Sequence, residues 1–224
     1  MSFWLFHKEP LQNTMINMEW NIDINKKRTR MKIDYLWKKL RDYKLSTEQK
    51  FQKYHNIGAS DEEIKRLEEN LSIVLPESFK KSLKITNGEI PVDTEDEDMS
   101  TWFGDWNTLL SCDRIFKESH DYYILFNKGE YILPWDEIYE IKNIPDRWSD
   151  KFIVFFDNNC EIYALLDMRE GDGKGQVLIT DIEAGILAFW ANSYEEWLEM
   201  AVDEVVLHGE LRLETMEKLL RIKE

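Results

Sequence analysis

A run of closely spaced carboxylates, DTEDEDM, is the part of the sequence best suited to bind an ion or a basic partner. Its acidic residues are Asp93, Glu95, Asp96, Glu97 and Asp98. Alternate carboxylates can chelate Ca²⁺, but the turn glycine of a calcium loop is missing here. The twelfth position is Gly104, where a bidentate Glu belongs. The sequence therefore favours a flexible acidic loop over a metal site.

Other residue types that support catalysis are scattered along the chain. The histidines form no metal-binding pair, and the cysteines match neither a disulfide framework nor a zinc spacing. The glycine-rich stretch EGDGKGQ lacks the Gly-Lys-Ser/Thr ending of a phosphate loop, so a hairpin turn is predicted there. We therefore predict no enzymatic activity, no cofactor and no bound metal. The residues considered are His7, His55, His120, His208, Cys112 and Cys160, with both cysteines expected to be reduced core thiols.

One enzymatic alternative stays open, a hydrolase that would use Asp157, Glu161 and Asp167. These carboxylates lie in or next to two predicted strands. They could act together only if a deep pocket gathers them around a metal ion.

Large aromatic residues follow the acidic run directly, in TWFGDWNTLL. Aromatic anchors beside complementary charge are typical of protein interfaces. The alternative is that the aromatic residues belong to the core and the acidic residues to a mobile loop. The candidate partner-binding residues are Asp93, Glu95, Asp96, Glu97, Asp98, Trp102, Asp105, Trp106, Asp157, Asn158 and Asn159.

The charge of the chain is unevenly distributed. The net charge is −15, but residues 1–57 carry 12 Lys/Arg and 6 Asp/Glu, whereas residues 58–224 carry 17 and 38. Such an acidic body repels nucleic acid and anionic lipid and attracts a basic protein over long range. Solubility alone is the alternative explanation. The start, MSFWLFHKEP, lacks the basic region of a secretory signal, so a cytoplasmic location is expected.

Three helices are predicted in the first half of the chain. MKIDYLWKKLRDY has apolar residues at helical spacing and should dock on its own domain. SDEEIKRLEENL begins with a capping box formed by Ser60 and Glu63. LPESFKKSLKITNGE should start with Pro76 in its first turn and end at Asn87-Gly88.

Short strands are predicted from about residue 120 onward, in DYYILF, EYILP, KFIVFF, EIYALLDM, QVLITDI and ILAFWA. Their close spacing favours antiparallel pairing. SYEEWLEMAVDEVVLHG then restores the helical period, with a second capping box at Ser193 and Glu196 and a stop at Gly209. The predicted class is α+β, a mostly antiparallel sheet flanked by N-terminal and C-terminal helices. The expected divisions are an arm over 1–30, a domain over 31–205 and a helical extension over 206–224.

An ordered series of landmarks runs through this domain. They are Glu68, Leu75-Pro76, Asn87-Gly88, LLSCDRI at 109–115, Leu166-Asp167 and a Ser-x-x-x-Trp-Leu helix start at Ser193. The series resembles the SUKH superfamily, which includes the Smi/Knr-type fungal cell-wall regulators and many bacterial toxin-immunity proteins. The resemblance implies a SUKH-type α+β scaffold without enzymatic activity that binds another protein. In bacteria that partner is frequently a secreted toxin with a nuclease domain, and the expected partner is therefore a basic toxin domain. The alternative is a regulatory scaffold in cell-envelope assembly or signalling.

Overall fold

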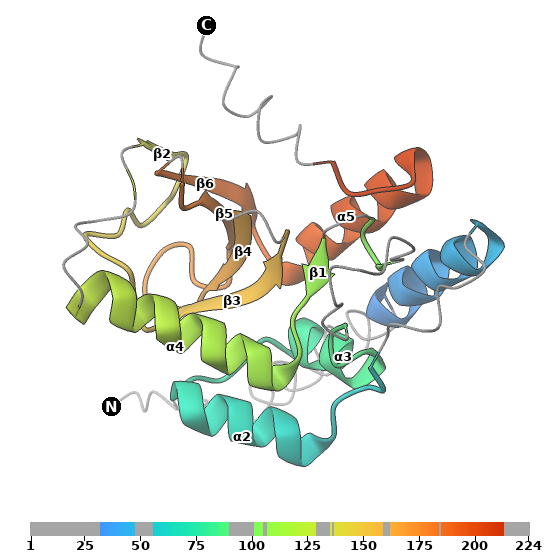
Figure 1. The fold of residues 1–224 in the computed structure, drawn as a ribbon, viewed down its shortest axis with the longest axis horizontal. Helices are drawn as coiled ribbons and strands as arrows, with labels where there is room; N and C mark the ends of the chain where they lie inside the picture. The colour runs from blue at the N-terminus through green and yellow to red at the C-terminus, as the bar shows by residue number, and fades with distance from the viewer. Residues whose placement is uncertain are drawn as a thin grey trace, which may run out of the picture.

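The computed structural model describes residues 32–47, 56–89, 101–104, 107–128, 135, 137–158, 162–183 and 185–212. The predicted arm over 1–30, the strand EYILP and the acidic run lie outside these ranges. The description begins with a helix over 32–47, drawn in blue in Figure 1.

Two short helices follow, α2 (Asp61–Leu71) and α3 (Glu77–Ile85). The capping box of α2 is confirmed, because the Glu63 amide donates to the Ser60 hydroxyl and the Ser60 amide donates to the Glu63 carboxylate. Pro76 is the N-cap of α3 and not a residue of its first turn. The predicted end of α3 was also wrong in detail. The helix stops at Ile85 and Thr86 is already extended, whereas the left-handed residue is Gly88, with φ +69°.

Among the described residues, the sheet has six strands in the order β1-β3-β4-β5-β6-β2. Every neighbouring pair is antiparallel except β2 and β6, which run parallel. The prediction of an α+β protein with a mostly antiparallel sheet is therefore confirmed. The strands are β1 (Thr108–Leu109), β2 (Glu137–Tyr139), β3 (Phe152–Asp157), β4 (Ile162–Asp167), β5 (Val177–Asp181) and β6 (Ile186–Ala191).

The predicted strand DYYILF is wrong, because these residues belong to the helix α4 (Cys112–Lys128). The buried residues of α4 are Cys112, Ile115, Ser119 and Phe126, which are three, four and seven positions apart. This spacing places them on one helical face. The β-branched and aromatic residues in DYYILF favour a strand locally, but packing on the sheet decides the outcome.

Helices cover both faces of the sheet (Figure 1). On one face, Tyr122 of α4 packs against Tyr163 of β4, with ring centroids 5.0 Å apart. Phe156 lies opposite Ala164, next to Tyr163, and therefore points to the other face, since side chains alternate along a strand. There it packs against Trp197 of α5 (Tyr194–His208). The core is thus built from aromatic residues on both sides of β3 and β4.

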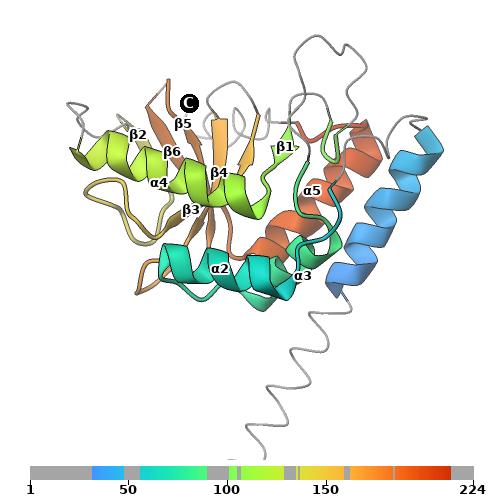
Figure 2. The same cartoon turned by 60° about the horizontal axis from the view of Figure 1, so that its bottom comes forward.

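The helix over 32–47 lies beside α5, as Figure 2 shows. Ile33, Leu36, Trp37 and Leu40 are buried, and the Trp37 ring nitrogen donates to the Ser82 hydroxyl at 2.8 Å. Lys32 pairs with Glu195 and Glu199 of α5. This confirms that the amphipathic helix docks on its own domain.

The predictions for the two ends of α5 are confirmed only in part. The Ser193 hydroxyl caps the helix by accepting from the Glu196 amide, and the helix stops at Gly209 as predicted. In a capping box the Glu196 carboxylate would accept from the backbone amide of Ser193. Here it accepts from the backbone amide of Asn192 at 3.1 Å instead.

Candidate partner-binding site

The buried carboxylate of Glu89 stands at the point where the chain enters the acidic segment. Its two oxygens accept hydrogen bonds from the backbone amides of Trp102 and Leu109, each at 2.6 Å. Glu89 therefore ties together the residues that precede and follow the acidic run. Burial raises the pKa of this carboxyl to about 8, against the opposing effects of the two backbone hydrogen bonds and of Lys44 and Arg114.

Asn87 and Gly88 form the corner just before Glu89. The Asn87 side chain accepts from the Cys112 amide at 2.8 Å and donates to the Glu63 carboxylate at 3.3 Å. It therefore joins the starts of α2 and α4. A Cβ on Gly88 would lie 2.4 Å from the backbone nitrogen of Ser111, so the two segments approach more closely than a side chain permits.

Trp102 is the aromatic candidate within the described ranges, and it lies in the core. It is 3% exposed, and its ring packs edge-on against Trp37 at a centroid distance of 5.0 Å. Its position matches the alternative in which the aromatic residues belong to the core. Asp93, Glu95, Asp96, Glu97, Asp98, Asp105, Trp106 and Asn159 lie outside the described residues, so their role in binding stays a prediction.

Asp157 and Asn158 lie at the end of β3, where the chain turns toward β4. Both are 7% exposed. The Asp157 carboxylate accepts from the Arg114 guanidinium at 3.3 Å, and the Asn158 side chain accepts from the Ile162 amide at 3.0 Å. These contacts give both side chains a structural function at this end of the sheet. Participation of this turn in partner binding stays a prediction.

The hydrolase alternative requires Asp157, Glu161 and Asp167 to meet. Glu161 lies outside the described residues, and the sheet separates the two aspartates. Asp157 pairs with Tyr163 and Asp167 with Phe152, so they stand at opposite ends of the β3–β4 pair. Five residues of strand correspond to about 16 Å. Within the described ranges, no group of three His, Cys, Asp or Glu side chains is placed to hold a metal ion.

Asp167 is instead a buried link within the β4–β5 hairpin. Its carboxylate accepts from the Arg169 guanidinium at 2.9 and 2.8 Å and from the side-chain amide of Gln176 at 3.0 Å. The guanidinium of Arg169 also lies 4.8 Å above the Phe152 ring. The stretch EGDGKGQ forms the turn of this hairpin, as predicted.

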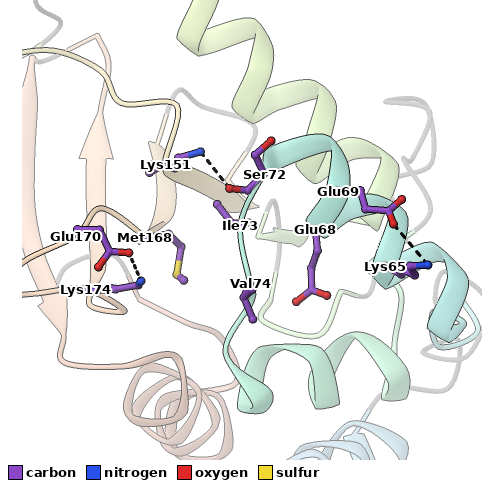
Figure 3. A pocket seen from close by; sticks show the side chains of 10 residues that line it. All are labelled: Lys65, Glu68, Glu69, Ser72, Ile73, Val74, Lys151, Met168, Glu170 and Lys174. Carbon is purple, nitrogen blue, oxygen red and sulfur yellow. Dashed lines mark hydrogen bonds and ion pairs between the residues drawn. The ribbon is translucent and has the colours of Figure 1, made fainter.

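A groove of about 590 Å³ lies between the α2–α3 connection and the β4–β5 hairpin (Figure 3). Ile73 and Val74 come from the connection, and Met168 comes from the end of β4. Lys151 links to the end of α2 by donating to the carbonyls of Leu71 and Ser72 at 3.2 and 3.3 Å. The remaining residues that line it are charged or polar: Lys65, Glu68, Glu69, Ser72, Glu170 and Lys174.

Sequence reasoning missed this groove, because its walls come from segments about 100 residues apart. One local signal was present in SIVLP, where two aliphatic residues stand between a helix end and a proline. Val74 is 75% exposed there. An exposed aliphatic residue in a short connection between helices is a weak signal by itself, since single exposed apolar residues are common.

The Glu68 side chain holds the connection in place. Its carboxylate accepts from the Leu75 amide at 2.8 Å and lies 3.5 Å from the Lys80 ammonium. This contact explains why an acidic residue in α2 accompanies the Leu75-Pro76 pair that opens α3.

These features define the class of the protein as an α+β domain with helices on both faces of a mostly antiparallel sheet. The chain belongs to the SMI1 / KNR4 family (SUKH-1), whose model matches residues 58–200. The docked helix over 32–47 lies outside the matched residues although it contributes to the core. No curated protein matches the chain. None of the helices among the described residues is long and apolar enough to cross a bilayer.

Proposed function

We propose that the chain is an immunity protein that neutralises a cognate toxin inside the producing cell by binding it directly. The observation that carries this proposal is the negative charge of the segment that contains the family domain. Residues 58–224 hold 38 Asp/Glu against 17 Lys/Arg. Nuclease domains bind a polyanion and therefore present a basic cleft, which an acidic protein can cover.

In this proposal, the protein acts by occlusion and without a catalytic step of its own. The acidic run would steer the encounter, because long-range attraction between opposite charges raises association rates. Glu89 precedes the acidic run, and Trp102 and Leu109 follow it. The hydrogen bonds between them hold these two parts of the chain together, which supports this role. A fixed base reduces the ordering that binding would otherwise require.

Co-expression tests the proposal. A toxin-domain gene found beside this one is induced in a host cell, with and without the present protein. We expect growth to be restored only when the present protein is made, and the two proteins to co-purify. No rescue of growth together with no complex would contradict the proposal.

The family also fits a regulatory scaffold in cell-envelope assembly or signalling. Genomic neighbourhood separates the two functions. A polymorphic toxin gene next to this gene is expected for an immunity protein, whereas an isolated housekeeping locus is expected for a regulator.

A further inference from the structure

The groove between the α2–α3 connection and the β4–β5 hairpin differs in charge from the rest of the molecule. Among the described residues its lining holds three lysines and three glutamates, whose charges sum to zero, on a protein of net charge −15. The charges are also paired locally. Lys65 lies 3.5 Å from Glu69 on α2, and Lys174 pairs with Glu170 across the hairpin turn, while Lys151 donates to backbone carbonyls.

The middle of the groove is apolar. Figure 3 shows Met168 on one side, with Ile73 and Val74 on the other. Val74 is 75% exposed, whereas Met168 is 7% exposed. Methionine adapts its shape to different apolar groups and is common at binding surfaces. A volume of about 590 Å³ suits a few aliphatic side chains.

The backbone of Val74, beside these apolar side chains, is available for pairing with another chain. Leu75 precedes a proline, which disfavours helical geometry and favours an extended backbone. The Leu75 amide is held by Glu68, but among the described residues no hydrogen bond is formed by the amide or the carbonyl of Val74. An exposed residue with a free amide and a free carbonyl can form a pair of backbone hydrogen bonds with an extended chain.

We infer that this groove binds an extended, uncharged segment of a protein partner that carries aliphatic side chains at alternate positions. Alternation would send every second side chain toward Met168 and Val74, while the backbone of the segment pairs with Val74. The lining disfavours a charged segment, because its lysines and glutamates offer no net attraction to offset the hydration that a charge loses in the groove. The inference rests on the proposed protein-binding function and assigns to it a second surface, separate from the acidic run.

A peptide titration followed by NMR tests the inference on the full chain. The probe is a capped synthetic octapeptide of alternating valine and serine, compared with peptides in which glutamate or lysine replaces serine. We expect saturable shifts at the methyl groups of Ile73, Val74 and Met168 with the neutral peptide, and at least about fivefold weaker binding of both charged peptides. No saturable shift at these methyl groups, or equal binding of the three peptides, would overturn the inference.

Two exposed aliphatic residues provide a matched pair of variants. Val74→Glu places a charge in the groove, whereas Ile57→Glu makes the same kind of change at a residue that is 92% exposed and does not line the groove. Only Val74→Glu should abolish the peptide shifts. It should also speed dissociation of the toxin domain about tenfold, which is the effect expected from losing one buried aliphatic side chain.

The same variants distinguish failure of this inference from failure of the proposed function. If the wild-type protein binds the toxin domain and Val74→Glu dissociates at the wild-type rate, the inference is wrong and the immunity function stands. If the wild-type protein binds no toxin domain but binds the neutral peptide through Val74, the groove is a peptide-binding site and the proposed immunity function is wrong.

Discussion

Gly88 occupies a corner where both backbone conformation and space exclude a side chain. Its φ is +69°, and an added Cβ would meet the backbone of Ser111 and Leu110 at 2.4 and 2.5 Å. Backbone atoms cannot move aside as a flexible side chain can. The close contact between this corner and the start of α4 therefore depends on glycine.

Gly88→Ala should lower the free energy of unfolding clearly more than Gly175→Ala. Gly175 also has a positive φ, of +88°, but nothing lies within 4 Å of its added Cβ. The control therefore shows only the cost of the left-handed backbone, about 1–2 kcal/mol. Urea denaturation of both variants measures the difference in their free energies of unfolding. Equal midpoints would show that the backbone around Gly88 moves aside without destabilising the fold, which would contradict the prediction.

Glu89 makes stability depend on pH in a defined direction. Its pKa rises from an ordinary value of 4.5 to about 8 in the folded protein. The folded state therefore binds more protons than the unfolded state between these values, so the contribution of Glu89 to stability is present below pH 4.5 and is lost as pH rises through 8.

Glu89→Gln removes this titration. The variant loses one hydrogen-bond acceptor at every pH, but its stability relative to wild type should rise by a few kcal/mol between pH 5 and pH 9. Urea denaturation at several pH values gives this difference directly. Glu62→Gln, at an exposed position of α2, is the control and should follow wild type. A constant difference between Glu89→Gln and wild type would mean that Glu89 is ionised throughout this range.

At the scale of elements, the helix over 32–47 belongs to the core although it precedes the family match. Trp37 is 1% exposed, packs against Trp102 and Phe103 and donates to Ser82. Trp37→Ala should lower the free energy of unfolding by about 3–5 kcal/mol. Lys38→Ala, at a position whose side chain is 73% exposed, should change it by less than about 0.5 kcal/mol. Similar urea midpoints for the two variants would show that the helix is only loosely attached.

Elements with local signals were predictable from the sequence, and elements that depend on distant partners were not. Ser60 and Glu63 fix the start of α2 by bonds within four residues, and β3 to β6 consist of β-branched and aromatic runs bounded by turns. In contrast, β1 has two residues and β2 has three, so each exists only through its neighbour in the sheet. α4 contains a strand-like stretch that becomes helical because one of its faces packs on β3.

The candidate site was less predictable than the fold, because more of it depends on contacts between segments that are distant in the sequence. Acidic composition is visible in the sequence, and it identified the run from Asp93 to Asp98. The burial of Trp102 depends on its contact with Trp37, which is 65 residues away. The groove depends on the α2–α3 connection and the β4–β5 hairpin coming together, and the aliphatic pair in SIVLP does not indicate which segment lies opposite it.

At the scale of the whole molecule, charge should control how fast a basic partner arrives. Replacing Asp93, Glu95, Asp96, Glu97 and Asp98 by Asn or Gln should slow association with the toxin domain and weaken its dependence on salt. The urea midpoint should stay the same, because Glu89 at the base of the run is retained. Stopped-flow measurements at low and high salt give both quantities. Unchanged association rates would show that the run is only a solvated loop.

The proposed function of this SUKH-1 protein is to neutralise a toxin by binding it. The most direct measurement is a titration of a purified toxin domain, from a nuclease toxin gene found beside this one, with its nuclease activity followed as the present protein is added. We expect a linear fall in activity that ends at one molecule of this protein per toxin domain, with a complex of the two in solution. Full nuclease activity at a large excess of this protein, with no complex, would contradict it.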